Sequence, residues 1–178
     1  MSGEEPIFLV GFMGSGKTRV GKLLSKRLGW GWVDLDHEIE AQAQMPISEI
    51  FKKEGESGFR LREKAVLDQF SQQEEIVVSC GGGIVTEADN LKQLLSLPRV
   101  VCLRLTPETV FKRVGNDPRR PLLHGQDPYG QIQKLMKARE GYYVQFSHQI
   151  DVDRLRTAEV VNEIIGLFGL DAFDTKRS

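Results

Sequence analysis

The chain has 178 residues, which suits one domain with a substantial core and leaves little room for a second. Hydrophobic residues make up 40% of it and charged residues 28%, as is typical of a globular protein in water. Its 24 basic side chains balance 25 acidic ones. The formal net charge of -1 therefore gives no general reason to expect binding to nucleic acid or to a membrane surface.

The first residues lack the features of a targeting segment. Residues 1–6 are acidic, whereas a secretory signal begins with basic residues and an apolar run. No later apolar run reaches the length of a membrane span. The two cysteines, Cys80 and Cys102, fall in or beside apolar segments, and we interpret them as core residues that form neither a disulfide nor a metal site. We expect a protein of the reducing cytoplasm.

Short apolar segments alternate with longer segments of helical period along the chain. The predicted strands are 7–10, 32–34, 76–79, 100–103 and a weaker 149–152. The predicted helices are 17–28, 38–44, 47–53, 58–70, 107–114, 129–143 and 158–168. This alternation predicts an α/β fold of three layers, α/β/α, in which helices cover both faces of a parallel sheet. Ligands of such sheets bind beyond the carboxyl ends of the strands.

No internal repeat or linker divides the chain, so we expect a single domain over residues 1–170. Residues 116–127 are predicted to form a long loop with basic and proline residues, and a loop of that length is often a lid or a binding loop. Residues 171–178 are predicted to be a C-terminal tail.

The strongest motif lies between the first predicted strand and the first predicted helix. Residues 11–18 read Gly-Phe-Met-Gly-Ser-Gly-Lys-Thr and match the phosphate-binding pattern G-x-x-x-x-G-K-[ST]. Glycines let backbone N–H groups approach a phosphate, and the helix start adds unpaired donors and partial positive charge. We therefore expect ATP here, with Lys17 at its β- and γ-phosphates and the Thr18 hydroxyl on Mg²⁺. The predicted nucleotide-binding residues of this loop are Gly14, Ser15, Gly16, Lys17 and Thr18.

Two carboxylates end the second predicted strand, at Asp34 and Asp36. Alternation along a strand places both on one side, where one could serve Mg²⁺ and the other could bind or polarise a hydroxyl group. The alternative is structural, because Asp36 also suits the N-cap of the helix that follows.

Other polar groups follow the strands or lie on the helices. Residues 81–83 are three glycines after the third strand, which permit close backbone approach to a ligand or form an ordinary turn. Arg60 and Arg139 could each bind a carboxylate through the planar guanidinium fork, or could be solvated helix charges. In the predicted lid, Arg119 and Arg120 could close on a transferring phosphoryl group or form a basic surface loop. The three histidines have no metal-like spacing.

In this order, the motifs resemble those of the shikimate kinase family. The resemblance spans residues 7–152. It rests on residues 11–18, Asp34-x-Asp36, Phe59-Arg60-x-x-Glu63, Gly81-Gly82-Gly83, Arg120-Pro121-Leu122-Leu123 and Arg139-x-x-x-Tyr143. The phosphate-binding loop alone is shared by many NTPases, whereas the combination is specific.

The resemblance implies a P-loop NTPase fold of the nucleoside-monophosphate-kinase type, with five parallel strands in the order 2-3-1-4-5. It implies ATP-dependent phosphorylation of the 3-hydroxyl of shikimate, on the route to chorismate and aromatic amino acids. ATP would be the co-substrate and Mg²⁺ the cofactor.

The resemblance also implies a role for each matching residue. Asp36 would hold the acceptor hydroxyls, and Arg60 and Arg139 would bind the shikimate carboxylate. The further implied roles are backbone contacts from Gly82 and Gly83, orientation of Arg60 by Glu63, ring walls from Phe51 and Phe59, Mg²⁺ binding by Asp34 with Thr18, a lid arginine at Arg120, and a position near adenine for Arg113.

We expect direct in-line transfer, because no Cys or His arrangement suggests a covalent intermediate. Asp36 could act as a base or only as a clamp. Two rival functions are another small-molecule kinase of this fold, acting on gluconate or a nucleoside monophosphate, and a non-enzymatic nucleotide-dependent switch. We expect shikimate and ATP as small-molecule partners, no nucleic acid or membrane, and a monomer.

Overall fold

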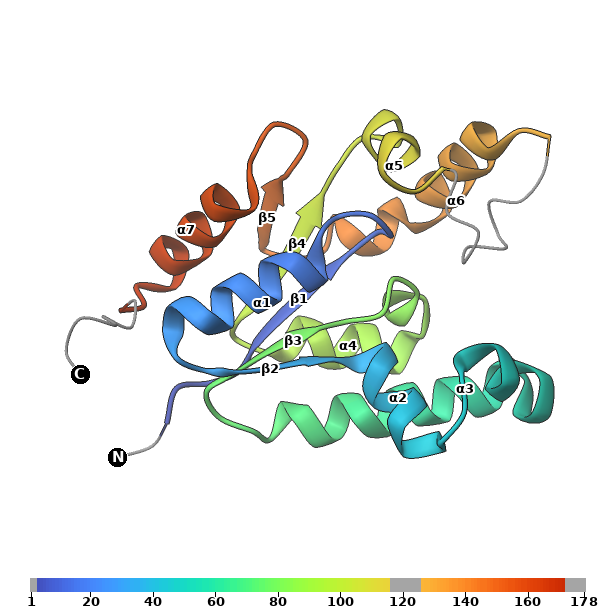
Figure 1. The fold of residues 1–178 in the computed structure, drawn as a ribbon, viewed down its shortest axis with the longest axis horizontal. Coiled ribbons are helices and arrows are strands. Elements are labelled where there is room, and N and C mark those ends of the chain that lie inside the picture. The colour runs from blue at the N-terminus through green and yellow to red at the C-terminus, as the bar shows by residue number, and fades with distance from the viewer. Residues whose placement is uncertain (1–2, 116–125, 172–178) are drawn as a thin grey trace.

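The computed structural model describes residues 3–115 and 126–171. Five parallel strands form one sheet in the order β2-β3-β1-β4-β5, which confirms the expected order (Figure 1). The strands are β1 (Ile7–Gly11), β2 (Gly31–Asp34), β3 (Ile76–Ser79), β4 (Val100–Arg104) and β5 (His148–Asp151).

Helices pack around this sheet in a three-layer α/β/α arrangement, with α1 lying beside α7 (Figure 1). The helices are α1 (Lys17–Leu28), α2 (Leu35–Ala43), α3 (Ile47–Ser71), α4 (Ala88–Ser96), α5 (Pro107–Val114), α6 (Pro128–Tyr143) and α7 (Thr157–Phe168), with a 3₁₀ turn, η1, at Ile84–Thr86. Within the described residues, no helix combines the length and the apolar character that a membrane span requires.

The middle of the sheet is buried on both faces, which explains the continuous apolar sequence of its strands. Every residue of β1 and β3 is buried, whereas only Ile150 is buried in the edge strand β5. Both cysteines are free and buried, in agreement with their assignment to the core. Since the strands are parallel, the segments that follow β1, β2 and β3 meet at one edge of the sheet (Figure 1).

The helices differ from the prediction in three places. The predicted segments 47–53 and 58–70 belong to one element, α3, that is interrupted at Gly55, whose φ of 71° and ψ of -176° are not helical. Helix α2 begins at Leu35, three residues before the predicted start. Helix α4 is absent from the predicted helices. Its N-cap position makes no side-chain hydrogen bond, so the usual sequence signal for a helix start is missing.

Gly21 brings α1 close to the sheet. A Cβ atom there would lie 2.6 Å from both Ser79 Oγ and Trp32 Nε1, two atoms that share a hydrogen bond of 3.2 Å. We expect Gly21→Ala to lower the free energy of unfolding by about 1–3 kcal/mol, because overpacking outweighs the higher helix propensity of alanine. Urea denaturation measures the change.

Gly166 of α7 supplies the matched control, because a Cβ atom there would meet nothing within 4 Å. Gly166→Ala should leave stability unchanged or raise it by up to about 1 kcal/mol. Equal effects of the two substitutions would contradict the packing argument.

Candidate active site

The loop after β1 has the backbone geometry of a phosphate-binding loop. Gly11, Gly14 and Gly16 have φ values of 150°, 75° and 91°, which residues other than glycine rarely adopt. A Cβ atom on Gly11 would lie 2.6 Å from the Leu103 carbonyl oxygen. Helix α1 starts at Lys17 with no side chain capping its first turn. The loop therefore presents backbone donors and the positive end of a helix dipole, a combination that binds anions.

Lys17 lies over this loop. Its Nζ donates hydrogen bonds to the carbonyl oxygens of Gly11 (2.6 Å) and Phe12 (3.1 Å) and to Ser15 Oγ (3.3 Å). These contacts hold the ammonium group beside the backbone donors, so the charge is placed where a bound phosphate would benefit from it.

Asp34 links the first turns of α1 and α2. Its Oδ2 accepts from Thr18 Oγ1 at 2.9 Å, and its Oδ1 accepts from the Asp36 backbone N–H at 3.1 Å. Asp34 is thus the N-cap of α2. The alternative interpretation, that Asp36 is the cap, is wrong, because the helix begins before Asp36.

The pair Thr18 and Asp34 fits the chemistry of a Mg²⁺ site. A hydroxyl and a carboxylate oxygen are hard ligands, and Mg²⁺ in kinases commonly uses one or two protein ligands together with phosphate and water. Over residues 3–115 and 126–171, no group of three or more His, Cys, Asp or Glu side chains could hold a metal by itself. The two oxygen donors of Thr18 and Asp34 suit an ion whose other ligands are phosphate and water.

Asp36 lies in the first turn of α2, directly against the backbone of Gly81. A Cβ atom on Gly81 would come within 2.6 Å of Asp36 Oδ1 and within 3.4 Å of Glu63 Oε1. Burial raises the pKa of Asp36 and the nearby Asp34 carboxylate adds to the effect, while Lys17 opposes it. The sequence pattern does not distinguish Gly81 from the other two glycines. The clash of a side chain at Gly81 with the Asp36 carboxylate becomes visible only in three dimensions.

Arg60 makes one strong ion pair and two loose ones. Its Nη1 lies 2.7 Å from Oε2 of buried Glu63, whereas its contacts with exposed Glu56 and partly exposed Glu87 are 3.5 and 3.6 Å long. Nη1 also donates to the Gly83 carbonyl oxygen at 3.3 Å. Burial lowers the pKa of Arg60, but the hydrogen bond and charge of Glu63 outweigh it, so that the pKa is raised and the guanidinium stays charged.

Arg139 approaches the same glycine turn from α6. Its Nη1 donates to the Gly82 carbonyl oxygen at 3.0 Å, and the Tyr143 hydroxyl donates to the same oxygen, also at 3.0 Å. Burial raises the pKa of Tyr143 to about 12, so the hydroxyl keeps its proton and remains a donor. Arg60 and Arg139, which lie on different helices, thus bind adjacent carbonyl groups.

The phosphate loop, both aspartates and the glycine turn face one cavity of about 1000 Å³. The residues that line it include Lys17, Thr18, Asp34, Asp36, Gly82, Gly83 and Arg139. Arg60 is not among them, but its Nη1 donates to the carbonyl oxygen of Gly83, which does line the cavity. Phe51 and Phe59 stack with a centroid distance of 4.8 Å, and Phe51 is 39% exposed.

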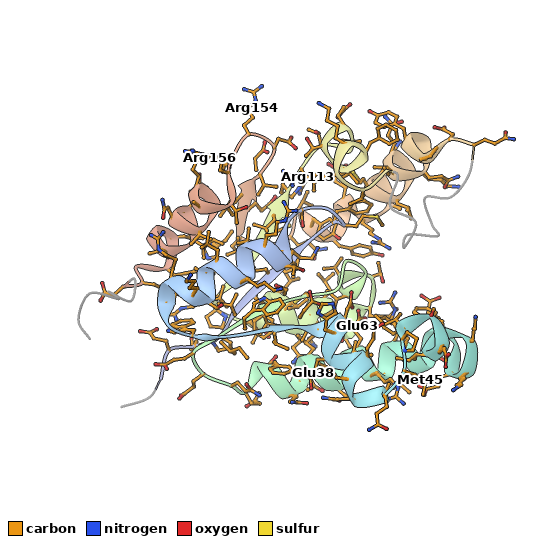
Figure 2. All side chains as sticks on the ribbon, in the orientation of Figure 1. Glu38, Met45, Glu63, Arg113, Arg154 and Arg156 are labelled. Carbon is orange, nitrogen blue, oxygen red and sulfur yellow. The ribbon has the colours of Figure 1, made fainter. Side chains whose placement is uncertain are left out.

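The far end of the cavity is bordered by Arg113. Its guanidinium donates to the carbonyl oxygens of Gly14 (2.9 Å) and Val152 (3.4 Å), and so joins the phosphate loop to the segment after β5. Arg113 thus lies beside the phosphate loop, whereas Figure 2 shows Arg154 and Arg156 projecting outward from the loop before α7.

Some predicted residues lie outside the described part of the chain. These are Arg119, Arg120 and His124, together with most of the predicted lid and tail. Asp127, at the end of the predicted lid, is described. It is the N-cap of α6 and accepts from the Gly130 backbone N–H at 2.9 Å.

The fold and site together define a P-loop kinase of the α/β class, with an acceptor pocket beside its phosphate loop. Comparison with known proteins narrows this class. The family model described as "Shikimate kinase" matches residues 13–168, and the chain belongs to the shikimate kinase family.

Individual relatives agree with this assignment. Shikimate kinase from Moorella thermoacetica is 43% identical over 89% of this chain and 91% of its own length. The structure of shikimate kinase from Acinetobacter baumannii in complex with shikimate has a TM-score of 0.86 and is 36% identical, covering 93% of each chain. A gluconokinase from Sinorhizobium meliloti reaches a TM-score of 0.58 at 16% identity, over 93% of this chain and 92% of its own, and therefore shares only the fold.

Asp36→Asn should make the protein more stable at neutral pH, because it removes a charge that burial disfavours. The raised pKa means that the folded chain binds this proton more tightly than the unfolded chain. The proton's stabilising contribution is complete below the ordinary pKa of 3.8 and is lost as the pH rises through the folded-state value. The advantage of the Asn variant should therefore shrink as the medium is acidified. Urea unfolding at several pH values measures this, and an advantage independent of pH would contradict it.

Proposed function

We propose that this protein transfers the γ-phosphoryl group of ATP to the 3-hydroxyl of shikimate, giving ADP and shikimate 3-phosphate. The observation that carries the proposal is the convergence of Arg60 and Arg139 on the turn at Gly82 and Gly83. Two guanidinium groups beside one cavity suit an acceptor that carries a carboxylate, and the structural neighbour from Acinetobacter baumannii was solved with shikimate.

On the nucleotide side, the phosphates of ATP would rest on the backbone N–H groups of Gly14, Ser15 and Gly16. Lys17 would move from the loop carbonyls to the β- and γ-phosphates, and Arg113 would lie toward the adenosine. Thr18 and Asp34 would hold Mg²⁺. When bound, that ion supplies positive charge to the β- and γ-phosphate oxygens.

On the acceptor side, Asp36 would accept hydrogen bonds from the hydroxyls of shikimate. Arg139 would bind the carboxylate, together with Arg60, whose long contacts with Glu56 and Glu87 can be exchanged for it. The backbone of Gly82 and Gly83 would touch the same ligand, and the rings of Phe51 and Phe59 would border it. Glu63 would keep Arg60 in place through the 2.7 Å ion pair.

Transfer would proceed in line, without a covalent enzyme intermediate. The chain contributes position and charge: Lys17 and the loop N–H groups would stabilise the transferring group, while Asp36 fixes the attacking hydroxyl. A raised pKa makes the Asp36 carboxylate a better proton acceptor than an exposed aspartate, and the same contact serves as a clamp. Arg120, whose role rests on the family resemblance alone, would add charge from the predicted lid. We also expect the enzyme to act as a monomer in the cytoplasm.

The test is a coupled ADP-release assay with shikimate, gluconate and nucleoside monophosphates as acceptors, on the native chain and on Arg60→Lys. Lysine keeps the charge beside Glu63 but loses the two-pronged fork. ADP release should depend on shikimate, and Arg60→Lys should raise the KM for shikimate by about tenfold or more while the KM for ATP changes little.

Arg62→Lys is the matched control. Arg62 lies two residues further along α3 and pairs with Glu54 at 2.8 Å through both Nε and Nη2, away from the glycine turn. The Arg62→Lys substitution should leave the KM for shikimate and the KM for ATP nearly unchanged. Equal turnover of gluconate and shikimate, or ADP release without any acceptor, would overturn the proposed function.

Asp34→Asn tests the Mg²⁺ assignment. Asparagine caps a helix as well as aspartate does, so α2 should survive while the negative charge is lost. The Mg²⁺ concentration for half-maximal activity should rise about tenfold or more. Asp127→Asn, at the N-cap of α6, is the control for capping alone. An unchanged Mg²⁺ dependence in Asp34→Asn would show that Asp34 does not serve the ion.

A further inference from the structure

Asn90 is a buried amide on α4 with no role in the proposed reaction. Asn90 is 1% exposed, and its Nδ2 donates a hydrogen bond to Glu63 Oε2 at 3.4 Å. Its Oδ1 is buried and accepts no hydrogen bond within the described chain. An unpaired buried carbonyl oxygen is costly to stability. If packing alone determined this position, we would expect an apolar residue such as the neighbouring buried Leu91 and Leu94. The amide therefore requires an explanation other than packing.

Glu63 is the group that explains it, since Asn90 makes its one side-chain hydrogen bond within the described residues to this carboxylate. Two donors converge on the same oxygen, Glu63 Oε2: Arg60 Nη1 at 2.7 Å and Asn90 Nδ2 at 3.4 Å. They come from different elements, one from α3 and one from α4. The carboxylate is thereby fixed on the side that faces Arg60, at the place shown in Figure 2.

The other charged or titratable groups facing Glu63 do not take the place of Asn90. Asp36 on α2 and Glu87 at the start of α4 are acids, and Cys80 after β3 is a buried thiol. Burial raises the pKa of Glu63, the two acids raise it further, and Arg60 opposes them. A neutral donor is the one kind of partner that favours the ionised form without competing with Arg60 for charge.

We propose that Asn90 is a positioning residue for the acceptor. Asn90 holds Glu63 ionised and aligned, so that Arg60 stays against Gly83, where it can bind the acceptor carboxylate. The inference rests on the proposed function. Asn90 donates a hydrogen bond to Glu63, Glu63 accepts one from Arg60, and Arg60 donates one to the Gly83 carbonyl oxygen at the wall of the cavity. Asn90 touches no reacting atom; it acts through its effect on a guanidinium.

The test compares Asn90→Leu with Gln93→Leu. Both side chains are amides of α4 that donate to a residue of α3, but Gln93 binds Ser71 at 3.2 Å, far along α3 from Glu63. Asn90→Leu should raise the KM for shikimate by about tenfold, with little change in the KM for ATP, and the defect should grow as the pH falls because Glu63 protonates more easily. Gln93→Leu should change neither the KM for shikimate nor its pH profile.

Asn90→Asp is the second variant, and it is sufficient by itself if Asn90→Leu does not fold. Aspartate has the same shape but donates to Glu63 only while it is protonated. Its defect in the KM for shikimate should therefore grow as the pH rises, opposite in sign to that of Asn90→Leu. A purely structural role of Asn90 would not give opposite pH trends.

The native chain separates failure of this inference from failure of the proposed function. If it does not phosphorylate shikimate, the proposed function fails and the inference with it. If it does, and either Asn90 variant that folds has the native KM for shikimate and the native pH profile, only the inference is overturned. The inference is likewise overturned if Gln93→Leu reproduces the change.

Discussion

The close approach of side chains to the bare backbone after β3 is the constraint on which the site depends. Asp36 lies against Gly81, Arg139 binds the Gly82 carbonyl and Arg60 binds the Gly83 carbonyl. A side chain at Gly81 would push away a carboxylate, and one at Gly83 would lie 3.2 Å from the guanidinium of Arg60. Glycine at positions 81 and 83 is thus favoured by the charged side chains around them, whereas a Cβ atom on Gly82 would make only an ordinary contact of 3.6 Å with the Met13 backbone nitrogen.

Charge balance explains why these groups can gather in a small space. Glu63 is buried and has a raised pKa, yet its short ion pair with Arg60 compensates part of the cost. Asp36 has no comparable ion pair among the described residues, and its ionisation is opposed by burial and by Asp34. One of these two acids is therefore paired within the fold, while the other lines the cavity. This division matches a positioning role for the first and a reacting or clamping role for the second.

Sequence patterns are sufficient to predict the strands and the phosphate loop, because both depend on local features, whereas the strand order is implied by the family resemblance. Buried strands are continuously apolar, and the loop from Gly11 to Thr18 has a fixed spacing. The patterns are insufficient for contacts between distant segments. Asp34, rather than Asp36, caps α2. Gly81 leaves room for the Asp36 carboxylate because it has no side chain. Helix α4 begins without a capping side chain. Each depends on where a neighbouring element lies, which a short-range pattern does not contain.

The unpredicted helix α4 is also the element that supplies Asn90. A short helix with a weak start is held by what it packs against, and part of that contact is polar: Asn90 reaches Glu63, and Asp89 pairs with Lys64 at 2.9 Å. Leu91 and Leu94 supply the apolar part of the contact, and a third apolar residue at position 90 would leave Glu63 with Arg60 as its single side-chain donor among the described residues. Since Glu63 in turn pairs with Arg60 at 2.7 Å, this polar contact connects α4 to the charged group that binds the Gly83 carbonyl at the wall of the cavity.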